Sequence, residues 1–264
     1  MRVALINAVR LHHAVDGTLT GPVLAFANSL GTDLRVWDAL LPHLPAGVRT
    51  LRYDMRGHGL SDAPEGDYWM GDLVADAAGL LDHLGLSGVT FVGLSIGGAV
   101  AQGLAAERPD LVRALVLCNT AAKIGTPQMW QDRIATVRAQ GMEPIADGVM
   151  ERWFSRRFRE SRPDDLALWR HMLTRTPRHG YAGCCAALAE TDLRESTARL
   201  TLPTLAIAGS EDGATPPDLV RETAETIPGA RFELIRGAGH IPPVEAPEEL
   251  GRLISGFLKD HALA

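Results

Sequence analysis

The sequence places a serine in the setting that nucleophilic catalysis requires. Ser95 is the central residue of GLSIG (93–97), between the aliphatic run 89–92 and the helical pattern 97–107. A sharp turn from strand to helix exposes such a hydroxyl, and the flanking glycines remove side chains that would clash in the turn. The pentapeptide alone is a weak signal, and a serine that only caps a helix is the alternative. Its position between a strand and a helix predicts a nucleophile.

A serine hydroxyl needs a base to take its proton. His240 follows the last predicted strand, and Asp212 follows the strand before it. Residues beyond the carboxyl ends of parallel strands meet at one edge of the sheet, and the order serine, acid, histidine is the one that accompanies this serine turn. We therefore predict that His240 is the base and that Asp212 orients and stabilises its imidazole.

Two other residues near strand ends are considered for the acid of the triad. Glu211 is adjacent and carries the same charge, so it is the rival for the acid. Asn119 follows the preceding strand but cannot supply a charge. A helix N-cap role for Asp212 is the structural alternative.

The tetrahedral intermediate of acyl transfer needs two fixed N–H donors. We expect one from Ile96, the residue after the nucleophile, and one from the loop after the strand that ends at Ala27. Alignment of this loop with the corresponding loop of proteins that share the serine turn indicates that the N–H of Leu30 is the second donor. Asn28 and Ser29 are expected to shape the loop.

Short aliphatic strands and longer helical patterns, which must position these residues, alternate along the chain. The strand patterns are short and bounded by Gly, Pro or Asp, and residues 1–15 predict a hairpin that turns near Asn7. Together they predict an α/β core with a mostly parallel eight-stranded sheet and helices on both faces. The strand patterns are 23–27, 48–53, 89–92, 114–118, 204–208 and 231–235, and the clearest helical patterns are 70–84 and 97–107.

One interval, residues 123–193, interrupts the alternation and contains several helical patterns rich in Arg and Trp. Over residues 123–183, 11 basic residues stand against 7 acidic ones, a net charge of +4; the rest of the chain carries −10, since the total is −6. We interpret residues 123–193 as a helical cap inserted into a core formed by 1–122 and 194–264. Its positive charge would attract anions, and a solvated charged surface is the alternative.

Composition narrows the class of protein. The 264 residues are 46% hydrophobic and 22% charged, enough for a large buried core. The net charge of −6 argues against a general affinity for nucleic acid or for an anionic membrane. The N-terminal apolar run is too short for a signal peptide, and no stretch approaches a membrane span. The sequence leaves the oligomeric state open.

The chain has three cysteines, Cys118, Cys184 and Cys185. Their low and odd number and the absence of metal-ligand spacing favour a reduced, cytoplasmic setting. A redox role for the adjacent Cys184 and Cys185 is the alternative.

Four blocks carry a resemblance to a known family. They resemble 3-oxoadipate enol-lactonases, α/β-hydrolases of the β-ketoadipate pathway of aromatic degradation, and the similarity covers nearly the whole chain. The serine turn and the DxRGxGxS-like loop belong to the whole superfamily, whereas NSLGTD and the segment 119–130 are more specific. Many relatives have His-Gly where this chain has Asn28-Ser29. The blocks are NSLGTDLRVWD (28–38), YDMRGHGLSDAP (53–64), GLSIGGAVAQGLAAERPDLVRALVLCNTAAKIGT (93–126) and IAGSEDGATPP (207–217).

The resemblance implies the α/β-hydrolase fold, a triad of Ser95, Asp212 and His240, and neither a metal nor an organic cofactor. It also implies a small lactone with a free carboxylate as the substrate, opened through an acyl-enzyme on Ser95. The alternatives are a carboxylesterase or a carbon–carbon bond hydrolase on another small ester or ketone, or a non-catalytic ligand receptor. Dehalogenases and epoxide hydrolases with an aspartate nucleophile are disfavoured because the turn carries serine.

Within the cap, Arg133 and Trp153 are the candidates for contact with the ligand. Arg133 would hold the carboxylate with two parallel hydrogen bonds. A surface arginine and a tryptophan in the cap's own core are alternatives of equal weight. Arg56 and His58 are expected to brace a loop rather than to take part in chemistry.

Overall fold

The chain folds around one sheet of eight strands. The strands are β1 (Arg2–Ile6), β2 (Val9–Gly17), β3 (Val23–Ala27), β4 (Arg49–Tyr53), β5 (Val89–Leu94), β6 (Val112–Cys118), β7 (Thr204–Gly209) and β8 (Arg231–Ile235). The computed structural model describes residues 2–18 and 20–263. The strand order is β1-β2-β4-β3-β5-β6-β7-β8; β2 pairs antiparallel with β1 and β4, and all other pairs are parallel. The predicted sheet is confirmed.

The two N-terminal strands form the predicted hairpin. Asn7 and Ala8 make the turn with positive φ angles of 49° and 63°, and Ile6 pairs with Val9 directly across it. Positive φ at both central residues is typical of a type I′ turn, whose twist matches that of the flanking strands. The second strand extends to Gly17, past the predicted end of the hairpin.

The central strands read as continuous aliphatic runs because both of their sides are covered. Every residue of β5 and β7 is buried. The six predicted strand patterns differ from the observed bounds by at most two residues. The start of β6 at Val112 was missed because Arg113 interrupts the aliphatic pattern; its guanidinium donates a hydrogen bond to the carbonyl of Leu263 (2.5 Å).

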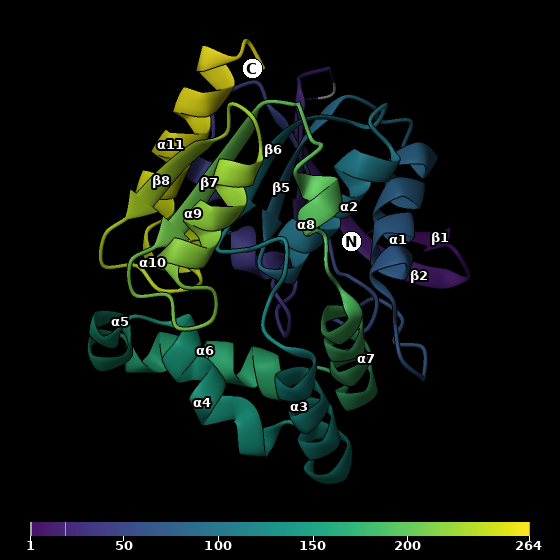
Figure 1. Ribbon diagram of the computed structural model, residues 1–264, viewed down its shortest axis with the longest axis vertical. Helices are drawn as coiled ribbons and strands as arrows, with labels where there is room; N and C mark the ends of the chain where they lie inside the picture. The colour runs from purple at the N-terminus through teal and green to yellow at the C-terminus, as the bar shows by residue number, and fades with distance from the viewer. Residues whose placement is uncertain (1, 19, 264) are drawn as a thin grey trace.

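Helices cover both faces of the sheet (Figure 1). Four of them, α1, α2, α8 and α9, pack in a row over one face, and α11 contacts β8 and η2 on the other. Helix α10 is a short helix that lies between β8 and α11 in the sequence. These elements are α1 (Met70–His83), α2 (Ile96–Glu107), α8 (Arg194–Thr197), α9 (Pro217–Thr226), α10 (Pro242–Glu245), α11 (Pro247–Asp260), and the 3₁₀ helices η1 (Leu34–Trp37) and η2 (Leu41–His43).

Five further helices form a separate group between β6 and α8. Figure 1 shows them in teal to green below the sheet, at the end where the strands before them finish. We call this group the five-helix layer. It consists of α3 (Pro127–Gln140), α4 (Glu143–Trp153), α5 (Arg156–Ser161), α6 (Pro163–Thr174) and α7 (Arg178–Glu190).

The five-helix layer contacts the core backbone to backbone through two glycines. Gly57, in the loop after β4, has a φ of 79°, and a Cβ added there would lie 2.6 Å from the Cα of Gly180 in α7. A Cβ added to Gly180 would lie 2.4 Å from the Cα of Gly57. Nearby, the N–H of Tyr68 donates to the carbonyl of Gly183 (3.2 Å). Side chains at either glycine would separate α7 from the core.

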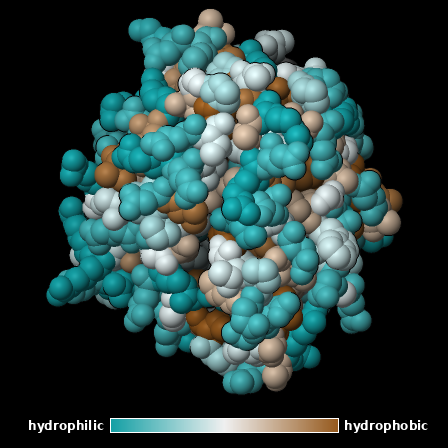
Figure 2. Space-filling model, viewed as in Figure 1, coloured by the Kyte–Doolittle hydropathy of each residue, from teal (hydrophilic) through white to brown (hydrophobic). Residues whose placement is uncertain are grey.

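The surface is mostly hydrophilic on the side shown in Figure 2, where apolar residues occur in small scattered groups. Within residues 2–18 and 20–263, no helix combines the length and the apolar character needed to cross a membrane.

We predict that Gly180→Ala destabilises the fold by about 2 kcal/mol or more, because the added methyl group would overlap the backbone of Gly57. Urea denaturation followed by circular dichroism measures this difference. Gly256→Ala is the matched control, since a Cβ at Gly256 in α11 meets nothing within 4 Å. It should stabilise the fold by roughly 0.5–1 kcal/mol through helix propensity. Equal stability of the two variants would contradict the proposed backbone contact.

Candidate active site

Ser95 has a strained backbone at the turn between β5 and α2. Its φ of 56° and ψ of −120° lie in a region that costs a non-glycine residue about 1–3 kcal/mol. Hydrogen bonds on both sides offset this strain. The N–H of Ser95 donates to the carbonyl of Cys118 (3.0 Å), and its carbonyl accepts from the N–H of Gly98 (2.8 Å) and from the hydroxyl of Thr120 (2.6 Å).

The glycines around Ser95 are required by close backbone packing. A Cβ added at Gly93 would lie 2.3 Å from the carbonyl oxygen of Gly97, so the turn itself has no room for a side chain. A Cβ at Gly97 would lie 2.3 Å from the carbonyl oxygen of Ala27, the last residue of β3. The start of α2 is therefore pressed against the end of β3, which brings Ile96 beside the loop that contains Leu30.

Asn28 and Ser29 shape that loop, as the sequence predicted. The side chain of Asn28 donates to the carbonyl of Tyr53 (2.9 Å) and accepts from the indole N–H of Trp37 (2.9 Å). The carbonyl of Ser29 accepts from both the N–H (3.1 Å) and the hydroxyl (2.9 Å) of Thr32. These bonds fix the backbone between β3 and η1.

His58 accepts a hydrogen bond from one of the N–H groups of the loop. The N–H of Gly31 donates to Nε2 of His58 (2.8 Å), and Nδ1 of His58 lies 3.3 Å from the carbonyl of Arg56. These partners indicate the neutral tautomer with its proton on Nδ1. Burial lowers the pKa of His58, which agrees with a neutral ring. Arg56 forms a buried ion pair with Asp76 (2.6 Å), so Arg56 and His58 brace loops as expected.

Among the described residues, two backbone N–H groups near Ser95 have no hydrogen-bond acceptor and can therefore donate to a ligand. Among the described residues, the N–H of Leu30 donates to no other residue. Ile96 is the first residue of α2, and the N–H of a first helical residue has no acceptor within its helix. The structure thus places both predicted oxyanion donors at the junction of β3, β5 and α2.

The side chains of Asp212 and His240 meet at the carboxyl ends of β7 and β8. Oδ2 of Asp212 lies 2.9 Å from Nδ1 of His240, and both side chains are buried. Oδ2 also accepts from the amide of Asn119 (2.8 Å) and the hydroxyl of Thr215 (2.8 Å), while Oδ1 accepts from the N–H of Ala214 (2.7 Å). The role of Asn119 was missed, because an uncharged side chain after a strand gives no catalytic signal.

The hydrogen bonds keep Asp212 ionised. Burial alone would raise the pKa of Asp212, but the charge of His240 and the hydrogen bonds from His240, Asn119 and Thr215 outweigh it and hold the pKa below its ordinary value. An ionised Asp212 at Nδ1 leaves Nε2 as the ring nitrogen that can accept a proton. No hydrogen bond joins the Ser95 hydroxyl to His240 among the described residues; catalytic bonds of this kind often tighten only when substrate binds.

Glu211, the rival acid, points away from the imidazole. It is exposed, and its carboxylate accepts from the N–H of Arg156 at the start of α5 (3.2 Å). Glu211 therefore contacts the five-helix layer and not His240.

Glu245 fixes the loop that carries His240. Its carboxylate accepts from the N–H of Gly239 (2.9 Å) on one side and from the hydroxyl of Ser155 (2.5 Å) on the other. Burial raises the pKa of Glu245. The N–H of His240 donates to the carbonyl of Trp153 (2.7 Å), which adds a second link between this loop and the five-helix layer. Glu245 was missed because an acid in the first turn of a helix is a common structural feature.

The two candidate ligand contacts of the five-helix layer differ in burial. Trp153 is buried, and the tip of its ring lies 3.4 Å from the position of a Cβ on Gly31. Arg133 is half-buried; its guanidinium lies 5.4 Å from the ring centroid of Trp130 and 3.5 Å from the hydroxyl of Tyr181. Tyr181, which the sequence did not single out, also lies beside Gly31 (3.2 Å from the same Cβ position). The layer thus reaches the loop of Leu30.

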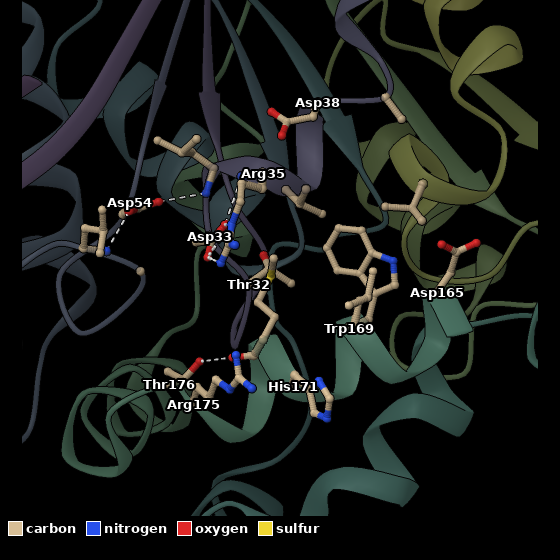
Figure 3. A pocket seen from close by; sticks show the side chains of 18 of the residues that line it. Thr32, Asp33, Arg35, Asp38, Asp54, Asp165, Trp169, His171, Arg175 and Thr176 are labelled. Atoms are coloured by element: carbon tan, nitrogen blue, oxygen red, sulfur yellow. Dashed lines mark hydrogen bonds and ion pairs between the residues drawn. The ribbon is translucent and has the colours of Figure 1, made fainter. Parts of the chain in front are cut away.

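A groove of about 740 Å³ lies next to this region, between the segment 32–39 and α6. Figure 3 looks into it, with the Asp33–Arg35 ion pair (2.6 Å) on one wall and Trp169 and His171 of α6 on the other. It shares Thr32 with the loop after β3, but the three predicted triad residues do not line it. In residues 2–18 and 20–263, no group of three or more His, Cys, Asp or Glu side chains is placed to hold a metal ion.

Comparisons with known proteins agree with this architecture. A family model described as the alpha/beta hydrolase fold matches residues 22–247. The chain is 38% identical to 3-oxoadipate enol-lactonase 2 of Acinetobacter baylyi over 95% of its own length and 94% of that protein. The crystal structure of the enol-lactonase from Burkholderia xenovorans LB400 matches with a TM-score of 0.95 and 38% identity, covering 98% of this chain and 100% of that one. A malate-bound thermophilic esterase from Thermogutta terrifontis matches with a TM-score of 0.89 and 30% identity, covering 98% of each chain.

We predict that Asp212→Asn lowers kcat on a neutral ester such as p-nitrophenyl acetate by roughly 10⁴-fold, since the amide can no longer stabilise the imidazolium or select the tautomer. Glu211→Gln is the matched control, because it removes the neighbouring charge without touching His240; its kcat should equal that of the wild type. If Glu211→Gln lowered kcat strongly while Asp212→Asn kept the kcat of the wild type, Glu211 and not Asp212 would be the acid.

Proposed function

The chain belongs to the α/β-hydrolase family and, within it, to the group of the 3-oxoadipate enol-lactonases, and we propose that it opens 3-oxoadipate enol-lactone to 3-oxoadipate in aromatic degradation. The observation that carries this function is the buried Asp212–His240 pair at the same edge of the sheet as the strained Ser95. The similarity to enol-lactonases over 95% of the chain supports the choice of substrate.

The first half of the reaction forms an acyl-enzyme. Nε2 of His240 takes the proton of Ser95 as Oγ attacks the lactone carbonyl carbon. The N–H groups of Leu30 and Ile96 donate to the resulting oxyanion. Asp212 stabilises the imidazolium that forms, because its low pKa keeps it negatively charged.

Collapse of the tetrahedral intermediate opens the ring. The bond between the carbonyl carbon and the ring oxygen breaks, and the departing enol oxygen takes its proton from His240. The enol then becomes the ketone of 3-oxoadipate. Water, deprotonated by His240, attacks the acyl carbon and releases the new carboxylic acid from Ser95.

The five-helix layer, within residues 123–193, acts as a cap that selects the substrate. Its fixed position is supported by the bond from the His240 N–H to the Trp153 carbonyl and by the contact of Trp153 with Gly31. Trp153 forms part of the wall around the lactone ring, and Arg133 binds the free carboxylate of the substrate. The net positive charge counted over residues 123–183 favours the approach of this anion.

The reaction takes place in the cytoplasm on a free small-molecule anion. The three cysteines, all free and buried, are compatible with a reducing compartment. Hydrolysis of other small carboxylic esters by the same residues is the second candidate function, supported by the match to the Thermogutta terrifontis esterase.

We predict that the wild-type protein opens 3-oxoadipate enol-lactone, with a kcat/KM well above that for p-nitrophenyl acetate, in a spectrophotometric assay. Ser95→Ala and His240→Ala should each lower kcat by about 10⁶-fold, since the nucleophile and base act as a unit. Ser87→Ala, at an exposed position away from the site, is the control and should keep full activity. A fluorophosphonate probe should label the wild type and Ser87→Ala but not Ser95→Ala. Turnover of the ester without turnover of the lactone would favour the second function.

We also predict that Arg133→Gln raises KM for the anionic lactone about 10-fold or more, because a charge-assisted hydrogen bond to the carboxylate is lost. The ratio of kcat/KM for the lactone to that for p-nitrophenyl acetate should fall by the same factor. A constant ratio would mean that Arg133 does not bind the carboxylate.

A further inference from the structure

We propose that His58 is a positioning residue for the oxyanion hole. Its Nε2 accepts from the N–H of Gly31 and thereby holds the turn 29–32 in the form that leaves the N–H of Leu30 free for the substrate oxyanion. This role rests on the acyl-transfer mechanism proposed above. It makes the acceptor nitrogen of a buried imidazole in the loop after β4 a determinant of kcat.

The proposed donor Leu30 lies in a tight turn. The N–H of Thr32 donates to the carbonyl of Ser29 (3.1 Å), and Gly31 between them has a φ of 82°. A positive φ at the third residue is typical of a type II turn, which favours glycine there. In a trans peptide the C=O and N–H groups point in opposite directions. Since the carbonyl of Ser29 points toward Thr32, the N–H of Leu30, which belongs to the same peptide, points out of the turn.

The N–H of Gly31 distinguishes the two common forms of such a turn. Type I and type II turns differ by a rotation of about 180° of the peptide between the second and third residues. In the observed form, the N–H of this peptide reaches Nε2 of His58 (2.8 Å). In the other form it would point to the opposite side and lose this acceptor. His58 therefore stabilises the observed turn, in which Gly31 and Thr32 use their N–H groups within the protein and Leu30 does not.

The N–H of Gly31 depends on His58 because the five-helix layer covers the turn. Gly31 is buried, and a Cβ added to it would lie 2.6 Å from Leu173 and 3.2 Å from Tyr181. A buried N–H without an acceptor is unfavourable, so without His58 the turn would shift to bring this group to another acceptor. Leu30 directly precedes Gly31 and would shift with it.

The imidazole of His58 is itself held in place. It is fully buried, and its Nδ1 lies 3.3 Å from the carbonyl of Arg56. The neighbouring Gly57 packs against α7, since a Cβ added to it would lie 2.6 Å from the Cα of Gly180. Nε2 is therefore presented to Gly31 from a segment that has little room to move.

Only the neutral ring can accept this hydrogen bond, because a protonated imidazole carries a proton on both nitrogens. Burial lowers the pKa of His58, although the hydrogen bond to Arg56 and the charges of Asp54 and Asp33 act in the opposite direction. The thiol of Cys184 lies 4.0 Å from Nδ1, and burial raises the pKa of Cys184, which keeps the thiol neutral. The surroundings thus favour the charge state that the acceptor role requires.

Two amide side chains test whether the acceptor nitrogen matters. The side-chain oxygen of Gln can lie where Nε2 of His58 lies, whereas that of the shorter Asn reaches only the place of Nδ1. We expect His58→Asn to lower kcat on p-nitrophenyl acetate by about 10- to 100-fold at unchanged KM, because a misplaced oxyanion donor weakens binding of the transition state and not of the ground state. His58→Gln should restore most of this loss.

His13→Asn is the matched control. His13 is also a buried histidine, but its Nδ1 lies 3.5 Å from the carbonyl of Leu11 in β2, away from the turn 29–32. The kcat of this variant should equal that of the wild type. Equal losses of kcat in His58→Asn and His58→Gln, with both proteins folded by circular dichroism, would show that the ring and not its acceptor nitrogen is required. That result, or a wild-type kcat in His58→Asn, would overturn the proposal.

Nitrogen NMR on the wild-type protein tests the hydrogen bond directly, also if the variants do not fold. In protein with isotope-labelled histidine and glycine, His58 should carry its proton on Nδ1. Its unprotonated Nε2 should show a scalar coupling to the amide nitrogen of Gly31. A proton on Nε2 of His58 at neutral pH would contradict the acceptor role.

The ester assay separates this proposal from the choice of substrate, because an oxyanion forms with any carboxylic ester. If the wild-type protein hydrolyses p-nitrophenyl acetate but does not open the lactone, and His58→Asn and His58→Gln differ as expected, the lactone function is wrong and the role of His58 stands. If the lactone is opened and His58→Asn keeps the kcat of the wild type on both substrates, the role of His58 is wrong and the function stands.

Discussion

The buried hydrogen bond between Asp212 and His240 is the interaction on which the proposed chemistry depends. It joins the loops after β7 and β8, and Asn119 extends it to the loop after β6 by donating to the same carboxylate oxygen. A buried carboxylate persists as an anion only when donors surround it, and here side-chain and backbone groups from three loops do so. The bond therefore sets the charge, the tautomer and the position of the imidazole at once.

The second constraint is the strained backbone of Ser95, which local sequence could not maintain alone. Contacts with distant segments hold it: Cys118 at the end of β6, Thr120 in the loop after β6, and Ala27 at the end of β3, against which Gly97 packs. Positive φ at a serine is stable only where the surrounding structure overdetermines it. The same contacts bring Ile96 beside the loop of Leu30, so that the packing that strains Ser95 also brings together the two proposed oxyanion donors.

The five-helix layer is joined to the site by polar contacts as well as by packing. Glu245 links Gly239 to Ser155, and the carbonyls of Arg152 and Trp153 accept from Gly213 and His240. The layer is therefore hydrogen-bonded to the loops that carry Asp212 and His240, the proposed acid and base. In a fold that supports many reactions, these bonds fix the proposed substrate-selecting residues relative to the proposed catalytic ones.

The sequence by itself determined the strand pattern, the helical interval and the three triad candidates, because buried strands and a strand–turn–helix serine leave strong local signals. Only the tertiary structure distinguishes the contacts of Asp212 from those of Glu211, since adjacent carboxylates look alike until one of them faces an imidazole. It also revealed the side-chain contacts of Asn119, Glu245 and Tyr181. Their roles depend on partners far away in the chain, and a contact between distant residues has no signature in the local spacing of residue types.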